Sequence, residues 1–284
     1  MVSDDSPTSR QLQQLISSEL RLTGLTEVPF GGSAQSLKAG GENADGAADF
    51  TVVVGAPALR KLLQQGSPRQ VIVVLITRGA LEEELSRALP RGGREIHAIV
   101  LDQPLGRYLD LIQLALPQRS RVGLLLGTGG GSQQKTLEKL ASVRDMNISV
   151  ARVFGDAVFI TQLERLLTQC DVLLALPDSS IHNRNTVQPL LLTTYRAGVP
   201  VVAYSEGYAQ AGALLALYST PSQLARQTAE VLQHLAQGRN VPQVQMPRYF
   251  SVSVNASVAR SLGLALPSGD ILRERLLQSS KASE

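Results

Sequence analysis

The residues that could bind or transform a ligand concentrate in one stretch, residues 170–212. An apolar run over 172–176 is short enough for a strand and ends in a polar loop over 178–183. A helical pattern follows, and a second apolar run over 199–204 ends in another polar loop, over 205–212. The side chains that these two loops offer are those of Asp178, Ser179, Ser180, Asn183, Ser205, Glu206 and Tyr208.

These residue types suit several kinds of chemistry. Asp178 and Glu206 could act as an acid/base pair, or bind the ammonium or hydroxyl groups of a ligand. Asp178 could instead cap a helix, because Asp is favoured at that position. Arg78 and Arg184 could bind a carboxylate in bidentate fashion, and Tyr208 could stack on a ring. The sequence leaves these alternatives open.

A glycine-rich loop at 127–132, GTGGGS, follows a predicted strand and opens a predicted helix. It lacks the Gly-Lys-Ser/Thr ending of a P-loop, and Ser132 occupies the position of the last glycine in the dinucleotide-binding pattern. The amino end of the helix could still hold an anion or a carboxylate near Thr128 and Ser132. A flexible turn is the alternative.

Metal and hydrolase chemistry fit the sequence poorly. The three histidines are dispersed along the chain, at His97, His182 and His234. Ser179, His182 and Asp178 share one short loop, where a catalytic triad rarely finds its geometry, and no G-x-S-x-G elbow occurs.

Composition narrows the classes of function further. Among 284 residues, 27 basic side chains nearly balance 24 acidic ones, and 4% are aromatic with no Trp, which argues against a nucleic-acid surface. The single cysteine, Cys170, excludes an internal disulfide and is expected to be a buried filler. No apolar run reaches the roughly 18 residues of a membrane span. The first residues do not read as a secretory leader, so the protein is either cytosolic or a mature form whose leader has been removed.

The elements that must position these groups alternate along the chain. Apolar runs predict strands at 50–54, 71–76, 96–101, 121–126, 148–153, 172–176 and 199–204, with helices between them. Residues 31–48, rich in Gly and Ala, are predicted to be a loop. A right-handed crossover places the carboxyl ends of neighbouring parallel strands at one sheet edge, where ligands bind in open α/β sheets. In the first half of the chain that edge would carry Gly55, Ala56, Thr77 and Arg78.

A weak internal repeat indicates two lobes. Residues 50–79 run strand, tight loop, helix, strand and polar loop, and residues 170–207 follow the same order with a longer helix. Two such halves imply two similar doubly wound lobes. Ligand sites favour interfaces of this kind.

Three later segments carry a family resemblance. They are CDVLLALPDSS at 170–180, AGVPVVAYSEGYAQAGALLALY at 197–218 and YFSVSVNASVARSLGLALP at 249–267. In this order they resemble the ABC-transporter solute-binding proteins of the tryptophan/tyrosine type, which have the periplasmic-binding-protein class I fold. The resemblance is good from 121 to 267 and weaker over 50–117. The chain departs from the family at 77–79, where an Asp-Pro pair is usual, and in the loop 127–132, where only Ser132 matches.

The resemblance implies an α/β fold of two Rossmann-like, doubly wound parallel-sheet lobes joined by a hinge. The first lobe would hold 1–114 plus 213–240, and the second 115–212 plus 241–284. It also implies a non-enzymatic, extracytoplasmic (periplasmic) component of an ABC import system, a monomer without cofactor, whose leader has been removed. Its partners would be a small polar solute and an ABC permease, with no nucleic acid.

The residues expected to contact the solute come from both lobes: Gly55, Ala56, Thr77, Arg78, Thr128, Ser132, Asp178, Ser179, Asn183, Ser205, Glu206 and Tyr208. If the solute is an amino acid, its carboxylate should meet a helix amino end near Ser132 or Asn183, and Asp178 or Glu206 should take its ammonium. Two other readings stay open. One is a two-lobed α/β transferase, and the other is a degenerate binding protein used for sensing or protein contact.

Overall fold

The computed structural model describes residues 2–3, 6–23, 26–30, 34–38, 49–65, 70–87, 95–127, 131–155 and 158–282. The chain forms two compact units. The first comprises Met1–Asp102 and Ser219–Tyr249, and the second comprises Gln103–Tyr218 and Phe250–Glu284. The chain therefore passes from one unit to the other three times.

The first unit is built on a mostly parallel sheet. In the described part of the chain the strand order is β12-β6-β5-β4-β3-β2, and β1 pairs with β4. The pairs β2–β3 and β3–β4 are antiparallel, and the others are parallel. The strands are β1 (Val2–Ser3), β2 (Thr26–Phe30), β3 (Ala34–Lys38), β4 (Asp49–Val54), β5 (Gln70–Ile76), β6 (Glu95–Val100) and β12 (Val244–Gln245).

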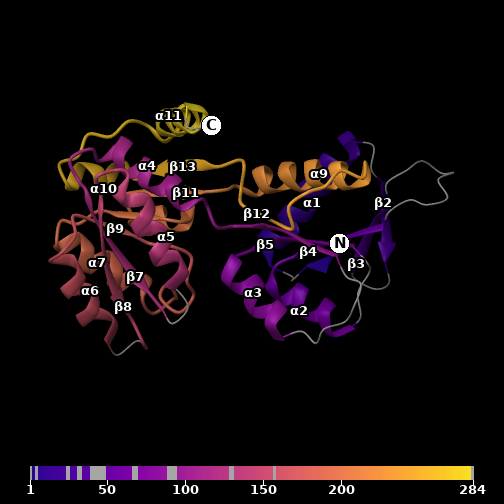
Figure 1. The fold of residues 1–284 in the computed structure, drawn as a ribbon, viewed down its shortest axis with the longest axis horizontal. Helices are drawn as coiled ribbons and strands as arrows, with labels where there is room; N and C mark the ends of the chain where they lie inside the picture. Colours follow the sequence, from indigo (N-terminus) through magenta and orange to yellow (C-terminus); the bar gives the residue numbers. More distant parts are fainter. Residues whose placement is uncertain are drawn as a thin grey trace. The chain divides into compact units, whose positions relative to one another are not determined.

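Helices cover both faces of this sheet (Figure 1). They are α1 (Pro7–Thr23), α2 (Ala56–Gln65), α3 (Arg78–Arg87) and α9 (Pro221–Ala236). Successive side chains of a strand point to opposite faces. Val52 and Val54 accordingly lie in the core with α1 and α9, whereas Val53 lies in the core with α2 and α3. Burial on both faces explains why these strands read as unbroken apolar runs.

The second unit is also built on a mostly parallel sheet, whose strand order is β13-β11-β10-β9-β7-β8. Only the pair β11–β13 is antiparallel among the described pairs of this sheet. The strands are β7 (Arg121–Leu126), β8 (Asn147–Arg152), β9 (Val172–Leu174), β10 (Val201–Ala203), β11 (Leu215–Tyr218) and β13 (Ser251–Val254).

Two layers of helices also enclose the second sheet. One core contains residues of α4 (Leu105–Ala115), α5 (Gly131–Ser142), α10 (Ala256–Ser261) and α11 (Gly269–Ala282). The other contains residues of α6 (Phe159–Leu167), α7 (Val187–Arg196) and α8 (Glu206–Ala211). The predicted α/β class with doubly wound parallel sheets is confirmed.

The units differ from the predicted lobes in where the chain crosses. Helix α4 lies in the second unit, because Tyr108, Leu109 and Ile112 pack in the core around β7 and β9. Strand β11 also belongs there, since it pairs with β10 and β13. Residues up to Tyr249 belong to the first unit, where β12 pairs with β6.

Two local predictions need correction as well. Part of the predicted loop 31–48 is strand β3, which pairs with β2 and β4, while 31–33 and 39–48 lie outside the described residues. The polar loop predicted at 205–212 contains helix α8. Both elements are too polar and too short to produce an apolar pattern. Among the described residues, no helix combines the length and hydropathy that a membrane span requires.

Candidate functional site

The polar loops of the second unit meet at one edge of its sheet. Strands β10, β9 and β7 are parallel neighbours, so the segments that follow them leave the sheet at the same edge. The polar parts of these segments begin at Ser205, Asp178 and Gly127 respectively. The sequence-based expectation that the two loops of 170–212 share one edge is therefore confirmed.

Asp178 fastens two of these segments together. Its Oδ2 accepts a hydrogen bond from the backbone N–H of Gly127 at 3.1 Å, and its Oδ1 accepts from the backbone N–H and the hydroxyl of Ser180 at 2.9 and 2.6 Å. A Cβ at Gly127 would lie 2.0 Å from Ser180 Oγ and 2.9 Å from Asp178 Oδ2, so a larger residue there would have to displace these side chains. Asp178 therefore acts first as a clasp between the loops after β9 and β7, while the neighbouring Ser179 is exposed.

The second loop folds into a short helix. Ser205 is the N-cap of α8, and its Oγ accepts from the backbone N–H of Tyr208 at 3.3 Å. Glu206 is exposed in the first turn. Burial and, to a smaller extent, the nearby Glu206 carboxylate raise the pKa of Tyr218, whose hydroxyl lies 3.2 Å from Ser253 Oγ. Glu206 and Asp178 thus have different protein partners.

A pocket of about 270 Å³ lies beside Glu206, within the second unit. Residues of α8 and of the segment from β13 into α10 line it, among them Glu206, Gln210, Ser253 and Asn255. Asn255 is committed to the fold, because its amide donates to Ala209 O at 2.8 Å and its Oδ1 caps α10. Glu206 and Gln210 are exposed and supply the polar groups that a solute could meet.

Three aromatic side chains of these loops and of the end of β10 pack against one another. The rings of His182, Tyr204 and Tyr208 lie 5.5–5.7 Å apart, and His182 Nδ1 is 2.9 Å from the Tyr208 hydroxyl. Burial lowers the pKa of His182 to about 4 and raises that of Tyr208. Tyr208 is only 4% exposed, so its ring has no free face for a ligand and instead anchors α8. The hydrogen bond to Tyr208 also leaves His182 outside any triad with Ser179.

The remaining predicted residues of this unit occupy the helix starts. The Oδ1 of Asn183 accepts from the backbone N–H of Asn185 at 2.9 Å, which makes a local turn. The buried Thr186, which the sequence reading missed, ties that turn to Ile181 O at 2.6 Å. Ser132 is exposed in the first turn of α5, and Thr128 lies outside the described residues.

The first unit offers a second set of loops at the carboxyl ends of β4 and β5. Gly55, with φ of 89°, turns β4 into α2, which begins at Ala56. Thr77 caps α3, since its Oγ1 accepts from Ala80 N at 3.2 Å. The backbone N–H of Arg78 donates to Asp102 Oδ2 at 2.7 Å.

Asp102 is the counterpart of Asp178 in the first unit. It follows β6, the neighbour of β5, and holds the start of the loop after β5 as Asp178 holds the loop after β7. Asp102 is 9% exposed, and this burial raises its pKa against the opposing effect of the Arg78 N–H. The sequence reading missed this residue, although an Asp directly after an apolar run at 96–101 is the same signal that singled out Asp178.

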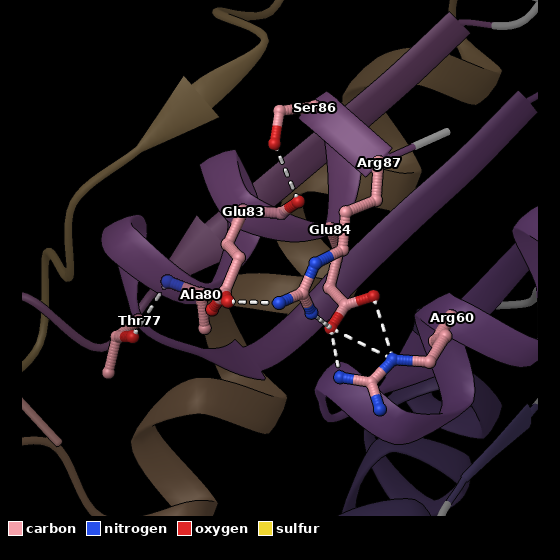
Figure 2. A network of polar contacts seen from close by, with 7 residues as sticks. All are labelled: Arg60, Thr77, Ala80, Glu83, Glu84, Ser86 and Arg87. Atoms are coloured by element: carbon pink, nitrogen blue, oxygen red, sulfur yellow. Dashed lines mark hydrogen bonds and ion pairs between the residues drawn. The ribbon is translucent and has the colours of Figure 1, made fainter. Parts of the chain in front are cut away.

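An ion-pair network fixes the two helices that carry these loops (Figure 2). Arg60 of α2 donates hydrogen bonds from its Nε and Nη2 to the buried carboxylate of Glu84 in α3. Arg87 lies 3.7 Å from Glu84 and 2.6 Å from Glu83. The hydrogen bond from Arg60 lowers the pKa of Glu84, so its charge is held in place near neutral pH. The network joins the middle of α2 to the carboxyl half of α3.

The described loops present hydroxyls, carboxylates and helix amino ends. No group of three or more His, Cys, Asp or Glu side chains among them could hold a metal ion. Cys170 is buried, and burial raises the pKa of its thiol to about 11, as expected of a filler. The arrangement suits non-covalent recognition of a polar molecule.

Comparisons with known proteins agree with this picture. The family model described as ABC transporter substrate binding protein matches residues 44–277. A search of the curated proteins found no significant match.

Solved structures share the fold at low sequence identity. A conserved domain protein of Vibrio cholerae is 18% identical, with 96% of each chain covered and a TM-score of 0.63. An ABC domain from Streptococcus pneumonia in complex with L-Trp is 17% identical, covering 97% of this chain and 96% of that chain at a TM-score of 0.61. The ligand-free, open structure of a substrate-binding protein with adhesive properties from Clostridium difficile is 15% identical, covering 95% and 97% at a TM-score of 0.67.

Proposed function

Because the chain belongs to the ABC transporter substrate-binding protein family, we propose that it captures a small polar solute and delivers it to an ABC permease for import. Proteins of this family bind solutes and perform no chemistry of their own. The family's usual place outside the cytoplasm supports an extracytoplasmic location for this chain. We further propose that it works as a monomer.

One observation carries the proposal in the molecule itself. Each unit collects polar side chains and helix starts at the carboxyl ends of its parallel strands, where ligands bind in α/β sheets. We take the two units as the two lobes of a binding protein and propose that the loops at these strand ends contact the solute. The two Asp clasps would then hold the loops of each lobe in shape before the solute arrives.

The solute is proposed to be an amino acid or a molecule of similar size. A structural neighbour holds L-Trp, and an amino acid needs one partner for its ammonium group and one for its carboxylate. Asp178 already accepts three hydrogen bonds from Gly127 and Ser180, whereas Glu206 is exposed and lines a pocket. Glu206 is therefore the better candidate for the ammonium group, and the amino end of α5 near Ser132 for the carboxylate.

A thermal-shift screen of the common amino acids, small sugars and polyols tests the proposal. We expect one solute class to raise the melting temperature of the wild type, as binding to the folded state requires. The variant Glu206→Gln should lose about tenfold or more in affinity, as expected for a charged contact. Glu164→Gln changes an exposed carboxylate on α6 and serves as the matched control.

The screen also tests whether Asp178 stabilises the loops in the absence of a solute. Asp178→Asn should lower the melting temperature without ligand, because an NH2 group, which donates hydrogen bonds, replaces one of the two carboxylate oxygens that accept them. If no solute stabilises the wild type, the proposed function is wrong. If Glu206→Gln binds the solute as well as Glu164→Gln does, the proposed ammonium contact is wrong.

A further inference from the structure

Phe154 occupies an unusual place at the edge of the second sheet. It follows β8, which pairs in parallel with β7 in a register that joins Arg152 to Leu126. The preceding residue, Val153, is buried and donates its N–H to Leu126 O at 2.9 Å. Phe154 is thus held next to the end of β7, at the same edge as the Asp178 clasp.

The ring of Phe154 is exposed although the local backbone is well fixed. It is 64% exposed, whereas Phe50, Phe159 and Phe250 are 2–3% exposed. Gly155 has φ of 93°, a conformation that turns the chain immediately after the ring. Arg152 donates to Gln134 Oε1 at 2.9 Å, which ties the end of β8 to α5. The sequence therefore keeps a large apolar ring in solvent on a supported strand end, among polar loops.

We propose that Phe154 is a specificity-determining residue that packs its ring against a flat or apolar part of the bound solute. The inference rests on the proposed function. It narrows the solute class to molecules that have both a flat or apolar part and polar groups. Aromatic rings offer a broad contact surface with few rotatable bonds, and they stack on other rings or on apolar faces. The carboxylates and helix starts at the same edge would take the polar groups of the same molecule.

The absence of Trp from the chain makes the proposal directly measurable. Phe154→Trp introduces a single fluorescent reporter at the proposed contact. Val143→Trp is the matched control, because Val143 is 77% exposed and lies after α5, just before β8 begins, at the opposite end of the same strand. Circular dichroism of both variants checks that the fold is kept.

The solute that stabilises the wild type in the thermal-shift screen is titrated into both variants. The emission of Phe154→Trp should shift and saturate over the concentration range of binding, and that of Val143→Trp should stay constant. Phe154→Ala should bind a solute with an apolar part about tenfold more weakly, as expected for the loss of an aromatic contact. Phe154→Leu, which keeps apolar volume, should recover part of that loss.

The outcomes distinguish this inference from the proposed function. A wild type that no solute stabilises contradicts both. A wild type that binds a solute, with unchanged emission in Phe154→Trp and unchanged affinity in Phe154→Ala, contradicts the role of Phe154 alone and assigns its exposed ring to another contact, such as a protein partner.

Discussion

At the scale of single residues, two carboxylates organise the loops: Asp178, which the sequence predicted as a site residue, and Asp102, which it did not. Asp178 and Asp102 each follow a parallel strand and accept a backbone N–H from the loop after the neighbouring strand. A carboxylate that receives such bonds fixes a loop without help from a ligand. The proposed ligand contact is therefore assigned to the exposed Glu206 and not to Asp178.

His182 makes the stability of the second unit sensitive to pH. Its folded pKa is about 4 because of burial, with the Asp178 carboxylate acting in the opposite direction, whereas an unfolded histidine titrates near about 6.5. The unfolded state therefore binds more protons between these values, and the free energy of unfolding should fall by roughly 2–3 kcal/mol as pH drops from about 6.5 to about 4.

Urea unfolding of wild type and His182→Gln at several pH values measures this contribution. The variant keeps a polar group near the Tyr208 hydroxyl and has no imidazole to protonate. The difference between the two proteins should change across this pH window. A constant difference from pH 7 to about pH 4 would show that His182 is not buried in its neutral form.

Gly123 and Cys170 form a tight contact inside the second unit. A Cβ at Gly123 would lie 2.6 Å from Cys170 Sγ and 3.3 Å from Leu166 Cγ. Gly123→Ala should therefore lower the free energy of unfolding by about 1–3 kcal/mol, the usual cost of overpacking. Cys170→Ala opens space there, so the double variant should lose less stability than the sum of the single variants. Additive losses in urea unfolding would argue against the contact.

At the scale of elements, the network around Glu84 joins α2 to α3. Glu84→Gln removes the charge that faces Arg60 and Arg87 and should lower the free energy of unfolding by about 1–3 kcal/mol at neutral pH. Because the folded pKa of Glu84 is depressed, its stabilisation is present above the unfolded pKa and is lost as pH falls through the folded pKa.

Melting temperatures of wild type, Glu84→Gln and Glu82→Gln test this network. Glu82 is exposed on the same helix and should behave like the wild type. The melting-temperature deficit of Glu84→Gln should be clear at neutral pH. It should shrink toward about pH 3, where the Glu84 carboxyl takes up a proton and becomes neutral like the glutamine. A deficit that persists unchanged in acid would point to packing, not charge.

The elements also show what a sequence can predict here. Strands such as β5 and β7 are buried on both faces and read as apolar runs, so their positions followed from pattern alone. Helix α8 has only six residues, EGYAQA, and no such pattern, so the sequence predicted a loop there. The clasp between Asp178 and Gly127 depends on β9 and β7 being neighbours, which strand order decides and local sequence does not encode. The burial of Tyr208 depends likewise on the distant His182.

At the scale of the whole molecule, contacts within each unit hold residues that lie next to the passages between the units. In the second unit Arg107 donates to Gln103 Oε1 at 2.5 Å and lies 4.2 Å from the centre of the Phe250 ring, so it holds the residues that follow two of the passages. In the first unit Ser219 Oγ donates to Tyr249 O at 2.6 Å.

Isothermal titration of the full chain with the solute panel tests the central claim most directly. The account predicts that at least one small polar solute binds saturably, with one molecule per folded chain, and that Glu206→Gln weakens this binding while Glu164→Gln does not. A correctly folded protein that binds no solute of the panel would contradict the claim that this chain is a solute-binding protein.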